Sequence, residues 1–504
     1  MTELFEMLST ITRRRKAESG SPFASVKATV KWLKTLPADS DYDAHHALVE
    51  GLERFNADNQ PASVSRMKSL LKMEEAGLPL QMRIVDQYVR NQAAFRLARK
   101  ALWRESSVFW SLLAEAWLVM LKQAYRGPAS AALKPFAAEF AARSLRYAAL
   151  TMRWNYHQAR CPIGSAWQRV HKIYRLAERD GLVAQDVLID GRPTHCAREY
   201  MLAVLMGLAH PVGYRAQEIE SIARLIDSYE PMPLPALVPQ PGEHTHAVDL
   251  SMGEGGFVLD KHVVQGRRLR YLALGPLVAH LKSLAQTLPQ EMESGLTSQL
   301  ASLIERGGIR RNRQRTHRFG RVWAAVGMDS ILNVLAHSDP EPVKNRPALE
   351  PWMLRDESTD GMGFALSEAA ALPHGSLVAV SWEPSENGWQ LLSVSWSREE
   401  DGQHLLGARR LSRRPKRVKV YFESGEPGVP QDETLAVFLP MIQTEQGVSN
   451  LLIPRTHYHP GAHLILREEA SVYRLRLGEV LETHEGWLRV GMDVVSREQF
   501  AVAA

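Results

Sequence analysis

The chain has 504 residues, with 61 Lys and Arg against 56 Asp and Glu, 45% hydrophobic residues and two cysteines. At roughly 150 residues a domain this length predicts about three domains, and the composition excludes a fibre or a disordered tail protein. Cys161 and Cys196 lie far apart with no CxxC motif, which excludes a zinc ribbon and a disulfide scaffold and fits a reducing compartment.

The net charge of +5 is distributed unevenly. Residues 310–321 hold six arginines, residues 409–419 hold seven Lys or Arg, and neither segment has an acidic residue. Without those thirteen cations the rest of the chain has a formal charge of −8. This pattern indicates sites for anionic ligands more than a basic coat.

The first residues, MTELFE, are acidic where a signal peptide is basic, and no long apolar segment follows them. The most apolar run, 108–121, is short and contains Glu115, so we expect a buried helix there rather than a membrane span. We therefore expect a cytoplasmic protein.

Residues 1–230 have apolar positions at helical spacing, as in Ile84, Tyr88, Phe95 and Leu102. Six of the twelve tryptophans lie here, and a tryptophan stripe at such spacing is typical of a core rather than of a cofactor site. We found no convincing 34-residue repeat. An all-α bundle or irregular helical array is the expected architecture.

Five prolines within eleven residues follow, and they predict a stiff extended linker at 231–243. Beyond it the apolar period changes to alternation, as in Leu392, Val394 and Trp396 with serines between them, which predicts strands. Asn387-Gly388 between two strand-like segments indicates a hairpin. Helices are expected within this part at about 276–288 and 294–306.

An internal similarity links two of the predicted strand regions. The segment DLSMGEGGFVL at 249–259 aligns without gaps with DESTDGMGFAL at 356–366, with Asp, Ser, Gly, Phe and Leu identical at five positions. We expect two related β units in tandem. Chance similarity between two glycine-containing strand starts is the alternative.

Two short motifs stand in order near the second of these segments. Arg311-x-x-x-Arg315 is weak alone because arginine is abundant here. Asp356-x-Ser358-x-x-Gly361 is more specific, since such a string arises by chance in about one chain of this length in five. Their order, with an arginine cluster upstream and alternating strands downstream, makes coincidence much less probable.

This pair of motifs resembles the signature of the PilZ domain family, the bacterial cyclic-di-GMP receptors, over roughly 308–425, about a quarter of the chain. The resemblance implies a small β-barrel with an arginine loop at its rim that binds phosphates and guanine edges. It also implies that the second motif lines a guanine site on the barrel surface. The predicted ligand-binding residues are Arg310, Arg311, Arg315, Asp356, Ser358, Gly361 and Gly363.

The residue chemistry agrees with this ligand. The guanidinium fork matches phosphate oxygens and guanine O6 and N7, and a carboxylate such as Asp356 accepts from the guanine Watson–Crick edge. Gly361 and Gly363 allow close approach of backbone to a purine. The forty residues between Arg315 and Asp356 exceed the family's usual spacing, which puts the return of the arginine loop to the same barrel in doubt.

The predicted fold is therefore a multidomain α+β chain with antiparallel β-barrel units and inserted helices. The expected parts are an all-α domain at 1–230, the linker at 231–243, a degenerate PilZ-like β unit with helices at 244–307, a PilZ-like barrel at 308–425 and a C-terminal β region at 426–504. The first β unit has Glu254 where the signature has glycine and no preceding RxxxR, so we expect no ligand there.

The leading hypothesis is a non-enzymatic receptor in which cyclic-di-GMP orders the arginine segment and re-orients the helical half for a protein partner. One alternative is a structural adaptor without nucleotide. Another is a nucleic-acid-binding regulator, but Phe319 is the one aromatic residue within the two basic segments, so nucleic acid is not expected. The run at 409–419 has no assigned role.

No cofactor or metal is expected. His244-x-His246 and His457-x-His459 have a spacing that metals use on a strand, yet neither pair has an acidic or cysteine neighbour in the sequence. The chain has no GxSxG, HExxH, P-loop or Rossmann motif.

Overall fold

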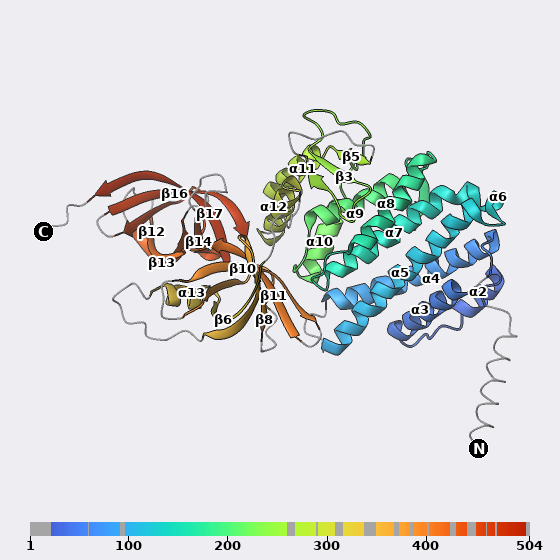
Figure 1. The fold of residues 1–504 in the computed structure, drawn as a ribbon, viewed down its shortest axis with the longest axis horizontal. Helices are drawn as coiled ribbons and strands as arrows, with labels where there is room; N and C mark the ends of the chain where they lie inside the picture. The colour runs from blue at the N-terminus through green and yellow to red at the C-terminus, as the bar shows by residue number, and fades with distance from the viewer. Residues whose placement is uncertain are drawn as a thin grey trace, which may run out of the picture. The chain divides into compact units, whose positions relative to one another are not determined.

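The computed structural model forms two compact units, each described here by itself (Figure 1). Unit 1 comprises Met1–His157, Cys161–His210 and Ile219–Leu277, and unit 2 comprises Gln158–Arg160, Pro211–Glu218 and Val278–Ala504. The structure describes residues 22–58, 60–90, 96–259, 268–288, 291–307, 316–336, 349–366, 372–383, 388–400, 403–423, 430–440, 450–459, 461–468 and 471–499.

Helices make up most of the described residues between 26 and 227, and serine side chains cap the first two helices that the structure describes. The Oγ of Ser25 accepts from the Ala28 amide and the Oγ of Ser40 from the Asp43 amide, as N-caps do. The helices are α2 (Val26–Leu33), α3 (Asp41–Ala57), α4 (Val64–Arg90), α5 (Arg96–Arg126), α6 (Ser130–Leu133), α7 (Ala137–Tyr156), α8 (Gly164–Arg179), α9 (Cys196–Ala209) and α10 (Ala216–Asp227).

Tryptophans form part of the helical core, as predicted. Trp117 and Trp154 have no exposed surface. Trp154 and Trp103 donate their indole N–H groups to each other's backbone carbonyls at 2.8 and 3.0 Å, which joins α5 to α7. These two indole N–H groups each have an acceptor, so both rings pack in the core without an unsatisfied donor.

A buried charge cluster also joins these helices. Glu74 of α4 accepts from the Trp117 indole at 2.7 Å and forms an ion pair with Arg143 of α7. Burial raises the pKa of the Glu74 carboxyl, and the Arg143 charge opposes that rise. Arg143 also pairs with Glu139, one turn away on its own helix, at 2.8 Å. Both Glu74 and Arg143 are almost fully buried, so removing Glu74 takes away one of the two carboxylates that compensate the Arg143 charge.

A short hairpin interrupts the helices, which the helical period did not predict. Strands β1 (Val187–Ile189) and β2 (Arg192–Thr194) pair antiparallel between α8 and α9. Asp190 and Gly191 at its tip both have positive φ, +52° and +69°. An Asp-Gly pair is the sequence signal for such a turn.

The predicted first β unit is a small open sheet followed by two helices. Its antiparallel strands lie in the order β4-β3-β5, and the described residues of 244–307 close no barrel. The helices fall close to their predicted positions. The elements are β3 (His246–Asp249), β4 (Phe257–Val258), β5 (Leu269–Leu272), α11 (Gly275–Thr287) and α12 (Glu291–Glu305).

Unit 2 contains two closed antiparallel barrels, which confirms the predicted α+β fold class. The described strands of the first follow the order β10-β11-β8-β7-β6-β9 around the barrel. Alternate residues such as Leu354, Phe364, Leu392 and Leu406 fill its interior. Its strands are β6 (Thr316–Val326), β7 (Glu350–Glu357), β8 (Gly361–Leu366), β9 (Leu377–Ser381), β10 (Gln390–Glu400) and β11 (Gln403–Ser412), with α13 (Met328–Leu335) after β6.

The second barrel has the strand order β12-β13-β14-β17-β16-β15. Strand β12 lies inside the segment predicted as the first barrel domain, 308–425, yet it is hydrogen-bonded to β13 and β15 of the second. The strands are β12 (Lys416–Glu423), β13 (Pro430–Leu439), β14 (Asn450–Pro454), β15 (His463–Glu468), β16 (Ser471–Thr483) and β17 (Trp487–Gln499).

The two barrels share one apolar cluster. Ala379, Leu391 and Leu411 of the first barrel pack with Val437 and Leu452 of the second. Neighbouring residues of a strand face opposite sides. One strand can therefore place alternate residues in the barrel interior and the residues between them in this shared cluster. Within the described part of the chain, no helix is long and apolar enough to span a membrane.

The Glu74 cluster generates a test of the helical core. We expect Glu74→Ala to lower the free energy of unfolding by about 3–5 kcal/mol, because the buried Arg143 loses one of its two carboxylate partners and the buried Trp117 indole loses its acceptor. Glu75→Ala is the matched control, since its side chain is exposed and pairs with Lys72 only one turn away. That control should change stability by less than about 0.5 kcal/mol. Equal effects of the two variants in chemical denaturation would contradict the assigned role of Glu74.

Candidate functional site

Four of the seven predicted ligand-binding residues lie in one hairpin. Asp356 is in strand β7, Ser358 is in the turn after it, and Gly361 and Gly363 are in strand β8. The other three, Arg310, Arg311 and Arg315, lie outside the described residues.

The long spacing between the two motifs does not separate β6 from the hairpin. Thr316, the first residue of β6, is the register partner of Glu357, and His317 is the partner of Asp356. The chain runs along β6 into α13 and later returns antiparallel along β7. Thr316 directly follows Arg315 in the sequence, so β6 begins beside the second motif.

The Ser358 side chain holds the turn together. Its Oγ accepts hydrogen bonds from the amides of Asp360 and Gly361, at 3.3 and 3.1 Å. The Ser358 amide donates to the Gly361 carbonyl at 2.8 Å. A serine at this position therefore supplies local hydrogen bonds to the turn, as Ser does in such motifs.

A buried arginine from strand β11 completes the turn. Arg410 donates through Nη1 to the carbonyls of Ser358 and Thr359, at 2.7 and 2.6 Å. It also donates through Nη2 to Glu357 and through Nε to Gln390, at 2.7 and 2.8 Å. Burial lowers the pKa of the Arg410 guanidinium, and the nearby Glu357 carboxylate opposes this shift.

Two glycines make room for these contacts. A Cβ on Gly361 would lie 2.5 Å from the Ala408 carbonyl oxygen, so a side chain cannot fit without moving backbone. A Cβ on Gly363 would lie 2.8 Å from a carboxylate oxygen of Asp356. The absence of a side chain at Gly363 thus allows the Asp356 carboxylate to lie over β8.

The outer surface of the barrel continues from Asp356 across four strands. Asp356 pairs with Gly363, Gly363 with Gly407, and Gly407 with Trp396, in one row through β7, β8, β11 and β10. The Trp396 indole lies against Gly407, and the Arg398 guanidinium lies 4.6 Å from the indole centroid. The row therefore has a carboxylate at one end and a planar aromatic and cationic pair at the other.

A β-bulge puts Trp396 on this outer face. The alternation with Leu392 and Val394 predicted all three on one side of the strand, and that is wrong for Trp396. The register shifts between Val394 and Trp396, so the indole leaves the side that fills the barrel. An extra residue in one strand reverses the facing of everything after it.

Arg409, the residue before Arg410, links the same strand to the second barrel. It donates to both carboxylate oxygens of Glu482 at 2.6 and 2.7 Å, and Glu482 also contacts His484 at 2.9 Å. Burial alone would raise the pKa of Glu482, but the Arg409 and His484 contacts hold it well below its usual value. The basic run at 409–419 thus contributes two structural arginines that face opposite sides of β11.

The His484 ring continues this contact toward the residues 211–218, which belong to unit 2. His374 lies 5.5 Å from His484 between ring centroids, and Tyr214 stacks on His374 at 4.2 Å. Gly213 has a φ of +87° and lies against the Ser395 carbonyl, and a Cβ there has no space. Burial, with the His484 charge, lowers the pKa of His374 to about 3.

The hairpin of the first β unit has the same register as the motif hairpin. Ala247 pairs with Phe257 in β3 and β4, and Leu354 pairs with Phe364 in β7 and β8, at the same offset along the chain. Its glycine loop is filled by protein, because a Cβ on Gly255 would lie 2.9 Å from the Trp167 indole. The Glu254 carbonyl accepts from His171 of α8 at 2.8 Å if that nitrogen carries the proton.

The histidine pairs make other contacts. His246 is buried and lies 2.8 Å from the Thr245 hydroxyl, while His244 accepts from the Gln240 amide at 2.7 Å. His457 lies 3.0 Å from the Thr456 hydroxyl. Among the described residues, no group of three His, Cys, Asp or Glu side chains has a geometry that would hold a metal ion.

Sequence reasoning missed Arg410 and Trp396. Arg410 lies in the basic run at 409–419, but the composition of that run does not distinguish the buried Arg410 from its exposed neighbour Arg413. For Trp396 the only signal is the large aromatic residue at the end of an alternating strand, and the bulge that turns it outward leaves no mark in the alternation.

One of the comparisons with known proteins concerns the helical half. Residues 27–233, about two fifths of the chain, match the model of the family described as "Cyclic-di-GMP receptor FimW, N-terminal domain". A solved structure described as "MrkH, A novel c-di-GMP dependence transcription regulatory factor" is 10% identical over 34% of this chain and 76% of that chain, with a TM-score of 0.13. That TM-score is too low to establish a shared fold. No curated protein matches the chain.

The Arg410 contacts generate one prediction. We expect Arg410→Ala to lower the free energy of unfolding by about 3–5 kcal/mol, because it removes a buried guanidinium that donates to two turn carbonyls and to the Glu357 carboxylate. Arg413→Ala, in the same basic run but exposed, is the control and should cost less than about 0.5 kcal/mol. Denaturant titration measures the free energy of unfolding of both variants. Similar decreases in the two would show that the positive charge of the run, and not the buried contacts of Arg410, determines stability.

The His374 environment generates a pH prediction. Its pKa is lower in the folded chain than the ordinary 6.5, so the unfolded chain binds the proton more tightly. Stability from this group is therefore full above about pH 6.5 and is lost as the pH falls toward 3, by up to about 1.4 kcal/mol per pH unit. Between pH 6.5 and 5, the free energy of unfolding of His374→Gln should change less with pH than that of the native chain. If the free energy of unfolding had the same slope against pH in both chains, His374 would not be the group responsible.

Proposed function

We propose that the chain is a non-enzymatic cyclic-di-GMP receptor whose first barrel is PilZ-like and carries the ligand site. The observation that carries this proposal is the single hairpin holding Asp356, Ser358, Gly361 and Gly363, with the start of β6 paired beside it. The match of the helical half to the N-terminal domain of a cyclic-di-GMP receptor family supports the same ligand independently of the motif.

In the proposed site, Arg310, Arg311 and Arg315 bind the two phosphates and the guanine acceptors from the segment before β6. Guanidinium groups match both kinds of acceptor in a bidentate manner. The Asp356 carboxylate accepts from the N–H groups of a guanine Watson–Crick edge. Since the phosphates are permanently charged, affinity should fall as the salt concentration rises.

The row across the outer surface extends this site. Gly363 and Gly407 have no side chains, so the Asp356 carboxylate lies over the first and the Trp396 indole lies over the second. A purine that approaches this row meets both groups. At the far end of the row, Trp396 and Arg398 present a planar pair of the kind that stacks on bases. Asp356 then sets the orientation of the base and the planar pair adds contact area.

The first β unit, in this proposal, is a copy that binds no ligand. Its hairpin keeps the register of the motif hairpin, but Trp167 occupies the space beside Gly255. Glu254 stands where the signature has glycine and would repel a phosphate.

We propose that ligand binding alters the interaction of the helical half with a protein partner. The contacts on β11 supply a physical route, because Arg410 holds the motif turn while Arg409 holds Glu482, which in turn meets His484. A change in the turn moves both arginines, since they are adjacent on one strand. The ring contacts of His374 with His484 and with Tyr214 extend this route to the 211–218 residues, which continue into α10.

Titration calorimetry with cyclic-di-GMP tests the site. We expect Asp356→Ala to weaken binding by about 10- to 100-fold, since it removes a charged hydrogen-bond acceptor. Arg311→Ala and Arg315→Ala should weaken it by similar factors and reduce its salt dependence. Asp249→Ala, the equivalent change in the first β unit, is the matched control and should leave affinity unchanged. Binding undiminished in the arginine variants would refute the site, and absence of binding by the native chain would favour the adaptor alternative.

Hydrogen exchange tests the proposed route. We expect cyclic-di-GMP to slow amide exchange in residues 211–218 of the native chain, because the Arg409–Glu482 contact lies on the route from the turn to these residues. In Arg409→Ala, binding should persist within about threefold while the change at 211–218 is lost. A ligand effect on 211–218 that survives this substitution would exclude the Arg409 contact as the route.

A further inference from the structure

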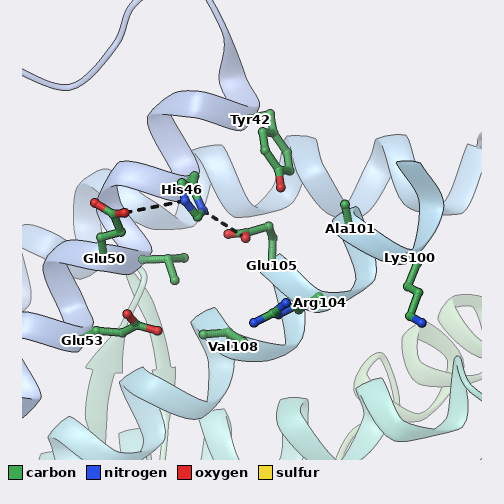
Figure 2. Close-up of a pocket in the computed structure, with 10 residues that line it drawn as sticks. Tyr42, His46, Glu50, Glu53, Lys100, Ala101, Arg104, Glu105 and Val108 are labelled. Atoms are coloured by element: carbon green, nitrogen blue, oxygen red, sulfur yellow. Dashed lines mark hydrogen bonds and ion pairs between the residues drawn. The ribbon is translucent and has the colours of Figure 1, made fainter. Parts of the chain in front are cut away.

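A cavity of about 520 Å³ lies in unit 1, between helices α3 and α5 (Figure 2). Its size is that of a small-molecule site, for which 300–1,000 Å³ is typical. It is distant in sequence from both motifs, and nothing in the proposed dinucleotide site uses it.

Two acidic residues line the cavity from α3, and two basic residues line it from α5. Glu50 and Glu53 project from α3, while Lys100 and Arg104 project from α5, as Figure 2 shows. Glu50 is paired with Arg54 on its own helix at 3.0 Å. Glu53, Lys100 and Arg104 form no ion pair with any residue that the structure describes. The cavity thus offers unpaired charge of both signs on opposite walls.

A further carboxylate lies deeper. Glu105 is 8% exposed and contacts His46 Nδ1 through Oε1 at 3.0 Å. Its other oxygen, Oε2, accepts no hydrogen bond and lies 3.8 Å from His45 Nδ1. Burial would raise the pKa of Glu105, but contacts with both histidines bring it below the usual value. The Glu105 carboxylate therefore stays anionic at neutral pH.

Apolar and aromatic groups lie between the charged walls. Val49, Ala101 and Val108 line the cavity, and the Tyr42 ring stacks parallel to His46 with centroids 6.1 Å apart. An aliphatic stem can pack on the apolar groups, and a guanidinium can lie on the exposed ring face. Packed helix axes are about 8–10 Å apart, so one extended amino acid can reach charges on both walls.

We propose that this cavity binds an amino acid with a cationic side chain, of the arginine class, either free or as the C-terminal residue of a peptide. Its side chain lies toward Glu53 and Glu105, and its carboxylate lies toward Lys100 and Arg104. The chain would then bind a second ligand in addition to the dinucleotide. This proposal goes beyond the proposed function because the cavity contains none of the motif residues.

Calorimetric titration of the full chain with L-arginine tests the proposal. We expect binding that weakens at least tenfold with agmatine, which lacks the carboxylate, and with norvaline, which lacks the guanidinium. Glu53→Gln and Arg104→Gln should each weaken L-arginine binding at least fivefold. Glu115→Gln and Lys122→Gln, exposed positions of α5 outside the cavity, are matched controls and should bind like the native chain.

Titration with the tripeptide Gly-Gly-Arg distinguishes a free amino acid from the C-terminal residue of a peptide as the ligand. Tighter binding of the tripeptide than of L-arginine identifies a peptide terminus, and weaker binding identifies the free amino acid. No binding of either compound at millimolar concentration, equal binding of agmatine, or undiminished binding by Glu53→Gln would overturn the proposal. Cyclic-di-GMP titration of the same samples reports separately on the dinucleotide site.

Discussion

The buried guanidinium of Arg410 is the interaction on which the motif end of the first barrel depends. One planar group satisfies two carbonyls of the motif turn, the Glu357 carboxylate and the Gln390 side chain. A turn that ends two strands at a barrel rim has carbonyls with no strand partner, and leaving them buried and unpaired is costly. With Arg410 in place, the Asp356 carboxylate has a defined position over Gly363.

Because side chains alternate along a strand, the same short end of β11 serves two purposes. Arg410 faces the motif turn and Arg409 faces Glu482 of the second barrel. This places the proposed ligand site and the contact between barrels one residue apart, with no flexible connection between them. A shift in the turn large enough to move Arg410 is therefore carried to Arg409, which is the physical reason for proposing a signalling route here.

Sequence patterns predicted much of the fold. Helical periodicity predicted the first half, and alternation with turn residues predicted antiparallel strands in the second. The tandem similarity of 249–259 and 356–366 is reflected in two hairpins of equal register. Local patterns failed where a bulge moved Trp396 to the outer face and where β12 joined the second barrel, because strand pairing and register depend on residues far away in the chain.

The sequence alone determined the two motifs, their order, the helical-then-β organisation and the concentration of positive charge, since these rest on residue type and short-range spacing. The tertiary structure decided which arginines are buried, that β6 begins beside Asp356 despite forty intervening residues, and that a mixed-charge cavity lies between α3 and α5. These features arise when distant segments pack together, and burial and pairing then give chemically identical side chains such as Arg410 and Arg413 different roles.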